Sequence, residues 1–300
     1  MPPQPTPDTL RGYVFAVSAY GLWGFMPLYM KMMADLSPFE VLAHRVVWSV
    51  PVAGAILWAL GRTGDLTEAL RTPRMLAMGA VTAVLVSLNW GIYIWAILND
   101  QALEAALGYY INPLFSVFLG RVLLGERLSP AKWLAIALAT GAVMVLTVDA
   151  GQVPLVAIAL MLTWGFYAYF KKSLPIGPNQ GFLLEVLMLT PAALAFIAWA
   201  GVTGAGQFAT NAPDTWLLLG CGVVTAVPLM LYANGAKLLR LSTIGILQYI
   251  APTMIFLIAV FVFGEPFGTA RAIAFPLIWL ALCIYSIALL REARRARSAA

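Results

Sequence analysis

Long apolar runs separated by short polar connections dominate this chain of 300 residues. The clearest runs are residues 75–98 and 241–264, which contain no Asp, Glu, Lys or Arg. A helix of about 20 apolar residues is long enough to cross the hydrocarbon core of a bilayer. The pattern therefore predicts membrane-spanning helices. We expect ten of them, at residues 12–30, 40–60, 75–97, 103–123, 132–148, 153–171, 181–201, 215–237, 243–263 and 272–290.

The composition supports this interpretation and excludes most soluble classes. Hydrophobic residues make up 62% of the chain and charged residues 10%, whereas soluble domains contain about 25% charged residues. The sequence has no phosphate-binding loop, zinc-protease motif or nucleophile elbow. We therefore expect an all-α integral membrane protein without a cofactor or a metal. An integral-membrane enzyme acting on lipids is an alternative, and it would need a convergent cluster of acids, bases or metal ligands.

The basic residues gather on one side of the predicted topology. If the N-terminus is cytoplasmic, most of the 18 Lys and Arg residues fall on the inner side. This asymmetry is typical of membrane proteins, whose cytoplasmic loops are enriched in Lys and Arg. The sequence thus predicts a multi-pass inner-membrane protein with both termini in the cytoplasm. Because the basic residues are scattered at loop ends next to lipid headgroups, they do not indicate binding to nucleic acid.

The chain contains an internal repeat of about half its length. The segment 106–128 recurs 139 positions later, at 245–267: both contain Tyr-Ile-x-Pro before an apolar helix and a Gly-Glu turn after it. We therefore expect two repeats, residues 1–150 and 151–300, each with five spans. An odd number of spans places the repeats in opposite orientations, which is a recurring plan of secondary transporters. The alternative is a duplicated membrane scaffold that transports nothing.

Two proline-interrupted helices in corresponding positions indicate where a solute binds. Pro113 and Pro252 lack the N–H that would bond to the carbonyl one turn earlier, so each weakens its helix and is a candidate hinge. Aromatic side chains repeated in both halves suit a flat or aromatic organic solute, such as an amino acid, an amine or a drug. The predicted solute-binding residues are Tyr20, Trp23, Asn89, Tyr93, Tyr110, Asn112, Trp164, Tyr167, Tyr232, Gln248 and Tyr249. An interfacial aromatic belt is the expected place of Trp90, Trp95 and Trp199.

Charged and titratable side chains inside the predicted spans are further candidates. Such residues are costly in a membrane and usually functional, so His44, Arg45 and Glu185 are predicted to take part in proton coupling. Snorkelling towards the interface or structural contacts between helices are the alternative for all three. Glu126 and Glu265, at the two Gly-Glu turns, are expected to anchor loops by pairing with basic residues or backbone N–H groups.

At these residues the chain resembles the drug/metabolite transporter superfamily. The resemblance is to EamA-type permeases, and among them to the RarD group, which was named for chloramphenicol sensitivity. It covers nearly the whole chain and is carried by residues 20–25, 44–48 (His-Arg-Val-Val-Trp), 89–90, 104–113, 124–127 and 241–252. It implies a bacterial inner-membrane protein with ten helices in two inverted EamA repeats. The cavity would lie mainly among the first, third, fourth, sixth, eighth and ninth spans. Ala251 stands where the first repeat has Asn112, so the two half-sites are not equivalent.

Repeat, prolines and resemblance together predict a secondary active transporter. The expected activity is that of a permease or exporter, which moves a small organic metabolite or drug across the inner membrane by alternating access. Its expected partners are that solute and membrane lipid, and we also consider a homodimer. Besides the membrane enzyme, a non-transporting subunit of a membrane assembly is the rival function.

Overall fold

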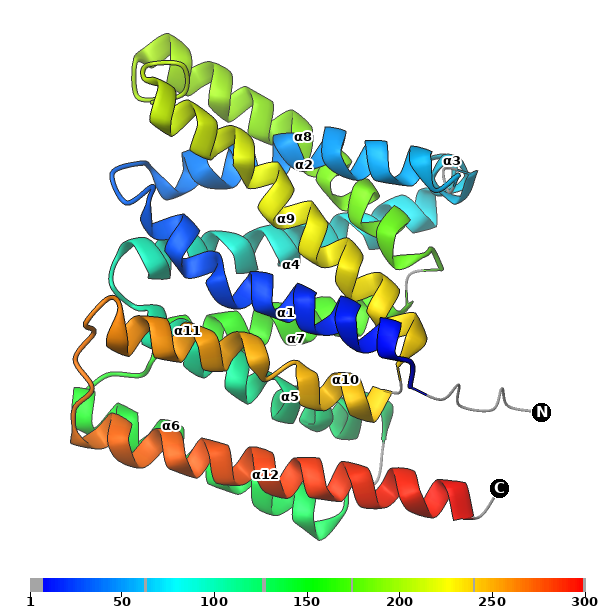
Figure 1. Cartoon of the computed structure of the whole chain (residues 1–300), viewed down its shortest axis with the longest axis vertical. Coiled ribbons are helices and arrows are strands. Elements are labelled where there is room, and N and C mark those ends of the chain that lie inside the picture. Colours follow the sequence, from blue (N-terminus) through cyan, green and yellow to red (C-terminus); the bar gives the residue numbers. More distant parts are fainter. Residues whose placement is uncertain (1–7, 62–63, 126–127, 174, 240, 299–300) are drawn as a thin grey trace.

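The computed structural model describes residues 8–61, 64–125, 128–173, 175–239 and 241–298. All regular secondary structure in these ranges is α-helical, as predicted. The helices are α1 (Leu10–Lys31), α2 (Pro38–Ala59), α3 (Gly64–Arg71), α4 (Pro73–Leu98), α5 (Ala102–Leu124), α6 (Pro130–Ala150), α7 (Leu155–Ser173), α8 (Pro178–Thr203), α9 (Ala212–Leu238), α10 (Leu241–Leu247), α11 (Ile250–Phe261) and α12 (Thr269–Ser298) (Figure 1).

Local chemistry explains where many of these helices begin and end. Proline occupies the first turn of α2, α4, α6, α8 and α9, where its missing N–H has no helical partner to lose. α5, α6 and α8 end at glycines with positive φ: Gly125 at 68°, Gly151 at 64° and Gly204 at 71°. A left-handed residue after the last turn is a common helix stop, and glycine adopts it without steric cost.

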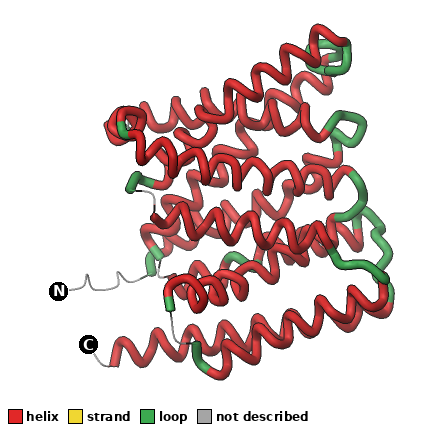
Figure 2. Tube along the Cα trace, turned by 180° about the vertical axis from the view of Figure 1, so that it is seen from behind, coloured by secondary structure: helices red, strands yellow, loops and turns green. Residues whose placement is uncertain are grey.

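The long helices lie side by side, and their connections lie at the two ends of the bundle (Figures 1 and 2). α1 begins and α12 ends at the same end (Figure 1). This arrangement is the one expected of a chain that crosses a membrane an even number of times.

Among the described residues, eight helical segments are long and apolar enough to cross a membrane, judged by length and composition. Two of the ten predicted spans, α1 and α7, lie outside this set. α1 has 22 residues, about 33 Å of helix, but Tyr, Trp and Gly dilute its apolar residues. The apolar part of α7, Leu155–Lys171, is shorter. The number ten therefore stays a prediction.

The span expected at 243–263 consists of two helices. α10 ends at Leu247 and α11 begins at Ile250, with Gln248 and Tyr249 in a turn between them. The break lies just before Pro252, which removes one helical hydrogen bond and crowds the preceding turn. A second departure is the short helix α3, which lies in the connection between α2 and α4 and packs against α4 and α8.

The core lies at the seam, which we define as the contact region between α1–α6 and α7–α12. The most extensive helix contacts all cross it: α6 with α12, α1 and α2 with α9, α2 with α8, and α5 and α4 with α7. The two halves therefore form one bundle with a shared interior.

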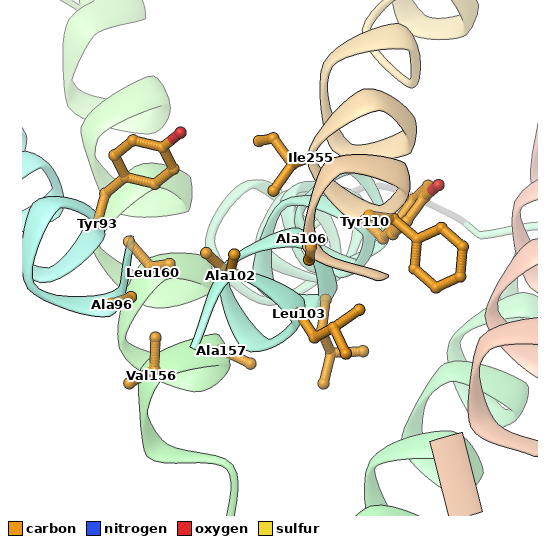
Figure 3. Close-up of a cluster of buried hydrophobic side chains, with 14 of the residues drawn as sticks. Tyr93, Ala96, Ala102, Leu103, Ala106, Tyr110, Val156, Ala157, Leu160 and Ile255 are labelled. Atoms are coloured by element: carbon orange, nitrogen blue, oxygen red, sulfur yellow. The ribbon is translucent and has the colours of Figure 1, made fainter. Parts of the chain in front are cut away.

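The N-terminal half of α5 is tightly packed at the seam. Ala102, Leu103 and Ala106 are almost fully buried and lie close to α7 in Figure 3. A Cβ on Gly108 would lie 2.7 Å from the carbonyl oxygen of Ala157. Only a glycine at this position lets the α5 and α7 backbones come this close, as is common between membrane helices.

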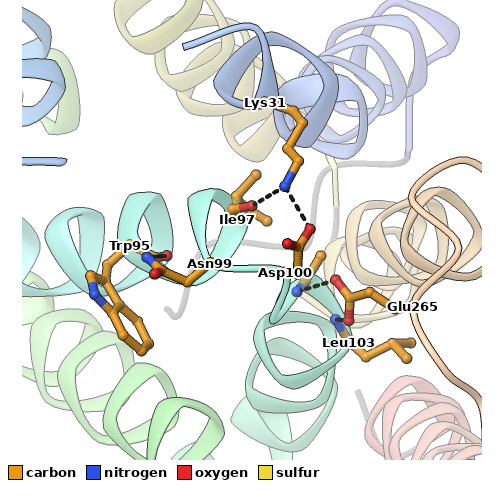
Figure 4. Close-up of polar contacts among 8 residues, drawn as sticks. Lys31, Trp95, Ile97, Asn99, Asp100, Leu103 and Glu265 are labelled. Carbon is orange, nitrogen blue, oxygen red and sulfur yellow. Dashed lines mark hydrogen bonds and ion pairs between the residues drawn. The ribbon is translucent and has the colours of Figure 1, made fainter. Parts of the chain in front are cut away.

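A polar cluster fixes the α4–α5 turn at one end of the bundle (Figure 4). The Glu265 carboxylate accepts hydrogen bonds from the backbone N–H groups of Ala102 at 2.6 Å and Leu103 at 3.0 Å, the first residues of α5. Lys31 pairs with Asp100 at 2.6 Å. Glu265 is thus a loop anchor, as predicted, and it satisfies N–H groups that a helix start leaves open. Glu126 lies outside the described residues.

Candidate solute-binding cavity

A cavity lies at the seam between α1, α2, α4, α5, α7, α9 and the α10–α11 segment. Its volume is about 150 Å³, counted as the space that the centre of a water molecule can occupy. One water needs about 10–15 Å³ by this measure, so the cavity has room for a small organic molecule. Its lining residues are Tyr20, Trp23, Met26, Arg45, Val86, Asn89, Trp90, Tyr93, Tyr109, Asn112, Trp164, Tyr167, Leu229, Tyr232, Gln248, Ala251, Pro252 and Ile255.

Two groups of aromatic rings form parts of the cavity wall. In the first, the rings of Tyr20, Trp23 and Tyr232 lie 5.6 to 5.8 Å from one another, joining α1 to α9. In the second, Trp164 lies 5.3 Å from Tyr167, both on α7. These separations are typical of favourable aromatic pairs, so the rings hold one another in place around the empty space.

Asn89 joins three helices beside the cavity. Its Nδ2 donates to the Leu160 carbonyl at 3.2 Å and to the Thr163 hydroxyl at 3.0 Å, both on α7. Its Oδ1 accepts a hydrogen bond from the Tyr109 hydroxyl at 3.0 Å. A fully buried amide with all these partners orients the neighbouring aromatic rings as well as lining the cavity.

Arg45 on α2 is the charged residue among those that line the cavity. Its side chain is buried, and its guanidinium carbon lies 4.5 Å from the centre of the Trp90 ring, a cation–π distance. Trp90 is only 5% exposed, so its expected place in an interfacial belt is wrong: the burial of Arg45 holds it inside. Trp95 and Trp199 are exposed, as an interfacial position requires.

Three side chains that line the cavity carry buried polar atoms without a hydrogen-bond partner among the described residues. They are Asn112 at its Oδ1, Tyr93 at its hydroxyl and Arg45 at its Nε and Nη1. Gln248, at the break between α10 and α11, donates from its Nε2 to the Gly245 carbonyl at 3.0 Å. Buried polar atoms without partners are rare in folded proteins, and here four of them belong to side chains that line one cavity.

Tyr110 and Tyr249 do not line the cavity, unlike the other nine predicted solute-binding residues. The Tyr110 hydroxyl bonds to the Thr253 hydroxyl at 2.8 Å, and its ring packs on Phe275. The Tyr249 hydroxyl is buried and has no partner among the described residues. Tyr110 lies one position beyond Tyr109, about 100° further around α5, and so faces away from the space.

The two predicted hinge prolines differ in structure. Pro252 lines the cavity and follows the α10–α11 break. Pro113 lies inside the continuous helix α5 and does not line the cavity.

His44 and Glu185 also lie off the cavity. The Nδ1 of His44 accepts a hydrogen bond from Trp48 Nε1 at 2.9 Å, and the His44 ring stacks on Phe208, 4.5 Å away. Glu185 pairs with Lys171 at 2.6 Å and accepts a hydrogen bond from Tyr167 at 3.2 Å. Their contacts are structural, and a part in proton coupling stays a prediction for both.

Several lining residues were not predicted from the sequence: Met26, Val86, Trp90, Tyr109, Leu229, Ala251 and Ile255. Tyr109 had a signal, because it lies one turn before Asn112 and 139 positions before Gln248. The aliphatic residues had none, since any apolar helix carries such side chains. No group of three metal-ligating side chains occurs among the described residues.

Comparison with known proteins agrees with this architecture. Residues 10–148 match the EamA-like transporter family. An "Uncharacterized transporter" of Vibrio cholerae is 42% identical, over 97% of each chain. This chain is an EamA-type permease of the RarD group. A protein named RarD from Streptomyces exfoliatus is 40% identical over 96% of this chain and 91% of its own.

A solved crystal structure of a protein shares the fold of this permease. It has a TM-score of 0.60 and covers 94% of this chain and 98% of its own at 22% identity. This likeness supports the fold alone. The relatives and the apolar helices together make this permease a multi-pass protein of the bacterial inner membrane and a membrane transporter.

Proposed function

We propose that this permease is a secondary active transporter, which carries a small organic solute through the cavity by alternating access. The observation that supports this most is the cavity itself, placed where the two halves of the chain meet and lined by both. Transporters of this plan bind their solute between the repeats and expose it to each side in turn. Exchange against a second solute or a proton would supply the drive.

The helix contacts support an inverted repeat of residues 1–150 and 151–300. If α1, α2, α4, α5 and α6 correspond to α7, α8, α9, α10–α11 and α12, the most extensive contacts across the seam have counterparts. The contact of α1 with α9 matches that of α7 with α4, and α2 with α9 matches α8 with α4. The contact of α5 with α7 likewise matches α11 with α1. This reciprocity is what a two-fold relation between the halves requires, and it implies ten spans, α1 and α7 included.

The break between α10 and α11 supplies an element that can move. Gln248, Ala251 and Pro252 all lie on the cavity wall at this break. Discontinuous helices in transporters often form solute sites, and loop-like residues absorb the backbone changes of a hinge. Movement of α11 relative to α10 would thus change the shape of the solute site directly.

The residues that line the cavity favour transport over the two rival functions, a lipid-modifying enzyme and a non-transporting assembly subunit. The lining contains tyrosines, amides and one arginine, but no histidine, cysteine or carboxylate. A lipid-modifying enzyme would need a general base or a nucleophile in its active site. The observed set suits binding, and a non-transporting assembly subunit would have no need for a cavity lined by aromatic rings and a few polar groups.

Access to the cavity from both membrane faces tests alternating access without knowledge of the solute. Cys221 and Cys283 are replaced by alanine, and Ala251→Cys is introduced on the cavity wall. An impermeant thiol reagent is then applied to right-side-out and inside-out vesicles. We expect labelling of Ala251→Cys in both preparations. Labelling from one face only, or from neither, would contradict alternating access.

Two exposed positions serve as matched controls and also test the orientation. Asp35→Cys lies between α1 and α2, and Glu68→Cys lies on α3. With cytoplasmic termini, Asp35→Cys should react only from outside and Glu68→Cys only from inside. The reverse pattern would place the termini outside.

A further inference from the structure

We infer that the solute is an organic anion whose carboxylate pairs with Arg45 inside the cavity. This inference rests on the proposed transport function and narrows its solute class. The expected set of amino acids, amines and drugs is thereby reduced to molecules that carry a negative charge next to a flat, apolar body.

The first observation is that Arg45 is buried without a counter-ion. It is 3% exposed, and its Nε and Nη1 have no hydrogen-bond partner among the described residues. A buried charge whose partner is missing destabilises a protein strongly, and intramembrane arginines almost always pair. The described residues supply no such partner, and a solute in the cavity that Arg45 lines would supply it.

The second observation is that the buried carboxylates of the described chain are engaged elsewhere. Glu185 pairs with Lys171, and Glu265 binds the start of α5. Glu40 accepts hydrogen bonds from the backbone N–H groups of Gln207 and Phe208, at 2.7 and 3.0 Å. The cavity lining contains neither Asp nor Glu. The space thus carries a net positive charge, which repels an amine and attracts an anion.

The geometry of the guanidinium favours a carboxylate. Trp90 lies against the Arg45 guanidinium, whose Nε and Nη1 have no acceptor among the described residues. A carboxylate can bind a guanidinium with two parallel hydrogen bonds. Asn112 Oδ1, also without a partner, would accept a hydrogen bond from an N–H or O–H on the same solute. The aromatic rings of Tyr20, Trp23 and Trp164 would contact its apolar body.

Three probes that share one ring and differ in their head group test this assignment. They are indole-3-propionate, its primary amide and tryptamine, which carry a carboxylate, a neutral amide and an ammonium. Binding to purified full-length protein in lipid nanodiscs is measured by calorimetry. We expect the carboxylate to bind about 10- to 100-fold more tightly than the amide, the range for charge-assisted hydrogen bonds. Tryptamine should bind most weakly.

Substitutions of Arg45 test whether its side chain causes the preference for the carboxylate. Arg45→Gln should abolish the preference for the carboxylate and leave the affinity for the amide within about threefold. Arg45→Lys should retain part of the preference, because lysine keeps the positive charge but lacks the two parallel N–H donors of a guanidinium. Lys132→Gln is the matched control: it removes one positive charge that pairs with Glu292 far from the cavity lining, and the preference should be unchanged. Binding of the amide reports an intact cavity in each variant.

The outcomes separate this inference from the transport proposal. Equal or tighter binding of the amide or tryptamine, no binding of any probe, or a preference that persists in Arg45→Gln overturns the role of Arg45. If Ala251→Cys is nevertheless labelled from both faces, the transport proposal stands. If the carboxylate binds through Arg45 but Ala251→Cys is labelled from one face only, the anion site is supported. Alternating access is then contradicted.

Discussion

α5 and the α10–α11 segment carry the same Tyr-Ile-x-Pro sequence, yet only the second is interrupted. α5 runs without a break from Ala102 to Leu124 with Pro113 inside it. Its counterpart ends at Leu247 and restarts at Ile250, two residues before Pro252. A proline costs both helices the same hydrogen bond. The difference must therefore come from what surrounds each helix.

Packing explains why α5 stays continuous. Its residues Ala102 to Leu107 are buried except for Glu104, and Gly108 lies against the α7 backbone. Residues 247–251 in the other segment are only partly buried. Gly245 replaces Ala106 there, which weakens a helix by about 1 kcal/mol. A proline thus interrupts a helix only where tertiary contacts do not hold it straight.

The tyrosines of the two motifs differ for a similar reason. The Tyr110 hydroxyl has a partner in Thr253. By the offset of 139, Thr253 corresponds to Leu114 in the first motif, which has no polar group. The Tyr249 hydroxyl is accordingly without a partner among the described residues. The difference between Thr253 and Leu114 therefore gives Tyr110 a hydrogen bond that Tyr249 lacks, so the two halves make different contacts at the seam.

The largest expected effect is at the close approach of α5 to α7. Gly108→Leu should lower the free energy of unfolding by about 3 kcal/mol or more, because its side chain would meet the Ala157 backbone. Gly245→Ala is the comparison in α10, where a new Cβ meets only side-chain ends, of Leu289 at 3.3 Å and of Gln248 at 4.0 Å, and it should be tolerated. Denaturant titration in mixed micelles measures both. Equal effects would show that α5 is not the better packed helix.

A smaller loss is expected when the start of α5 is released. Glu265→Ala removes a carboxylate that binds two backbone N–H groups and should cost about 2 kcal/mol of unfolding free energy. Asp100→Asn is the control, because its pair with Lys31 is mainly exposed and should contribute less than about 1 kcal/mol. Denaturant titration measures both variants. If Glu265→Ala lowers the free energy of unfolding by less than Asp100→Asn does, Glu265 does not anchor the start of α5.

Removing the two tyrosine hydroxyls should have opposite consequences. Tyr110→Phe should cost about 1 kcal/mol, since the Thr253 hydroxyl loses the hydrogen bond that it accepts. Tyr249→Phe should be neutral or slightly stabilising, because the hydroxyl it removes is buried without a partner. A double-mutant cycle of Tyr110→Phe with Thr253→Val isolates the first interaction. No coupling energy in that cycle would be incompatible with the bond.

The smallest expected effect concerns the prolines themselves. Pro252→Ala restores an N–H that can bond to the Gln248 carbonyl, so amide exchange across residues 247–252 should slow about twofold to fivefold. This range corresponds to a hydrogen bond of about 0.5–1 kcal/mol. Pro113→Ala should change exchange in α5 less, since that helix is already held by packing. Hydrogen-exchange mass spectrometry compares the two, and faster exchange in Pro252→Ala would contradict a break caused by proline.

Much of this permease can be predicted from residues alone because a membrane restricts the choices. Apolar runs must become helices there, since unpaired backbone groups are too costly in lipid. Repetition of Pro113 as Pro252, and of aromatic residues in both halves, identifies the helices that surround the cavity. Nine of the eleven residues expected to bind solute accordingly line it.

Side-chain partners depend on distant segments and could not be predicted in this way. Trp90 has the composition of an interfacial residue, but Arg45 from another helix holds it inside. Tyr110 and Tyr109 are adjacent in the chain, yet one reaches Thr253 and the other Asn89. Such choices follow from how the helices are rotated against one another, which a hydropathy pattern does not contain.

The order of apolar runs, the duplicated motif and the charge asymmetry are properties of the chain, and they suffice for an all-helical membrane transporter of this family. Which proline breaks its helix, which tyrosine finds a partner and which arginine is left without one are decided by three-dimensional packing. The physical reason is that propensity and periodicity act over a few residues. Burial and pairing act between helices that the folded bundle alone brings together.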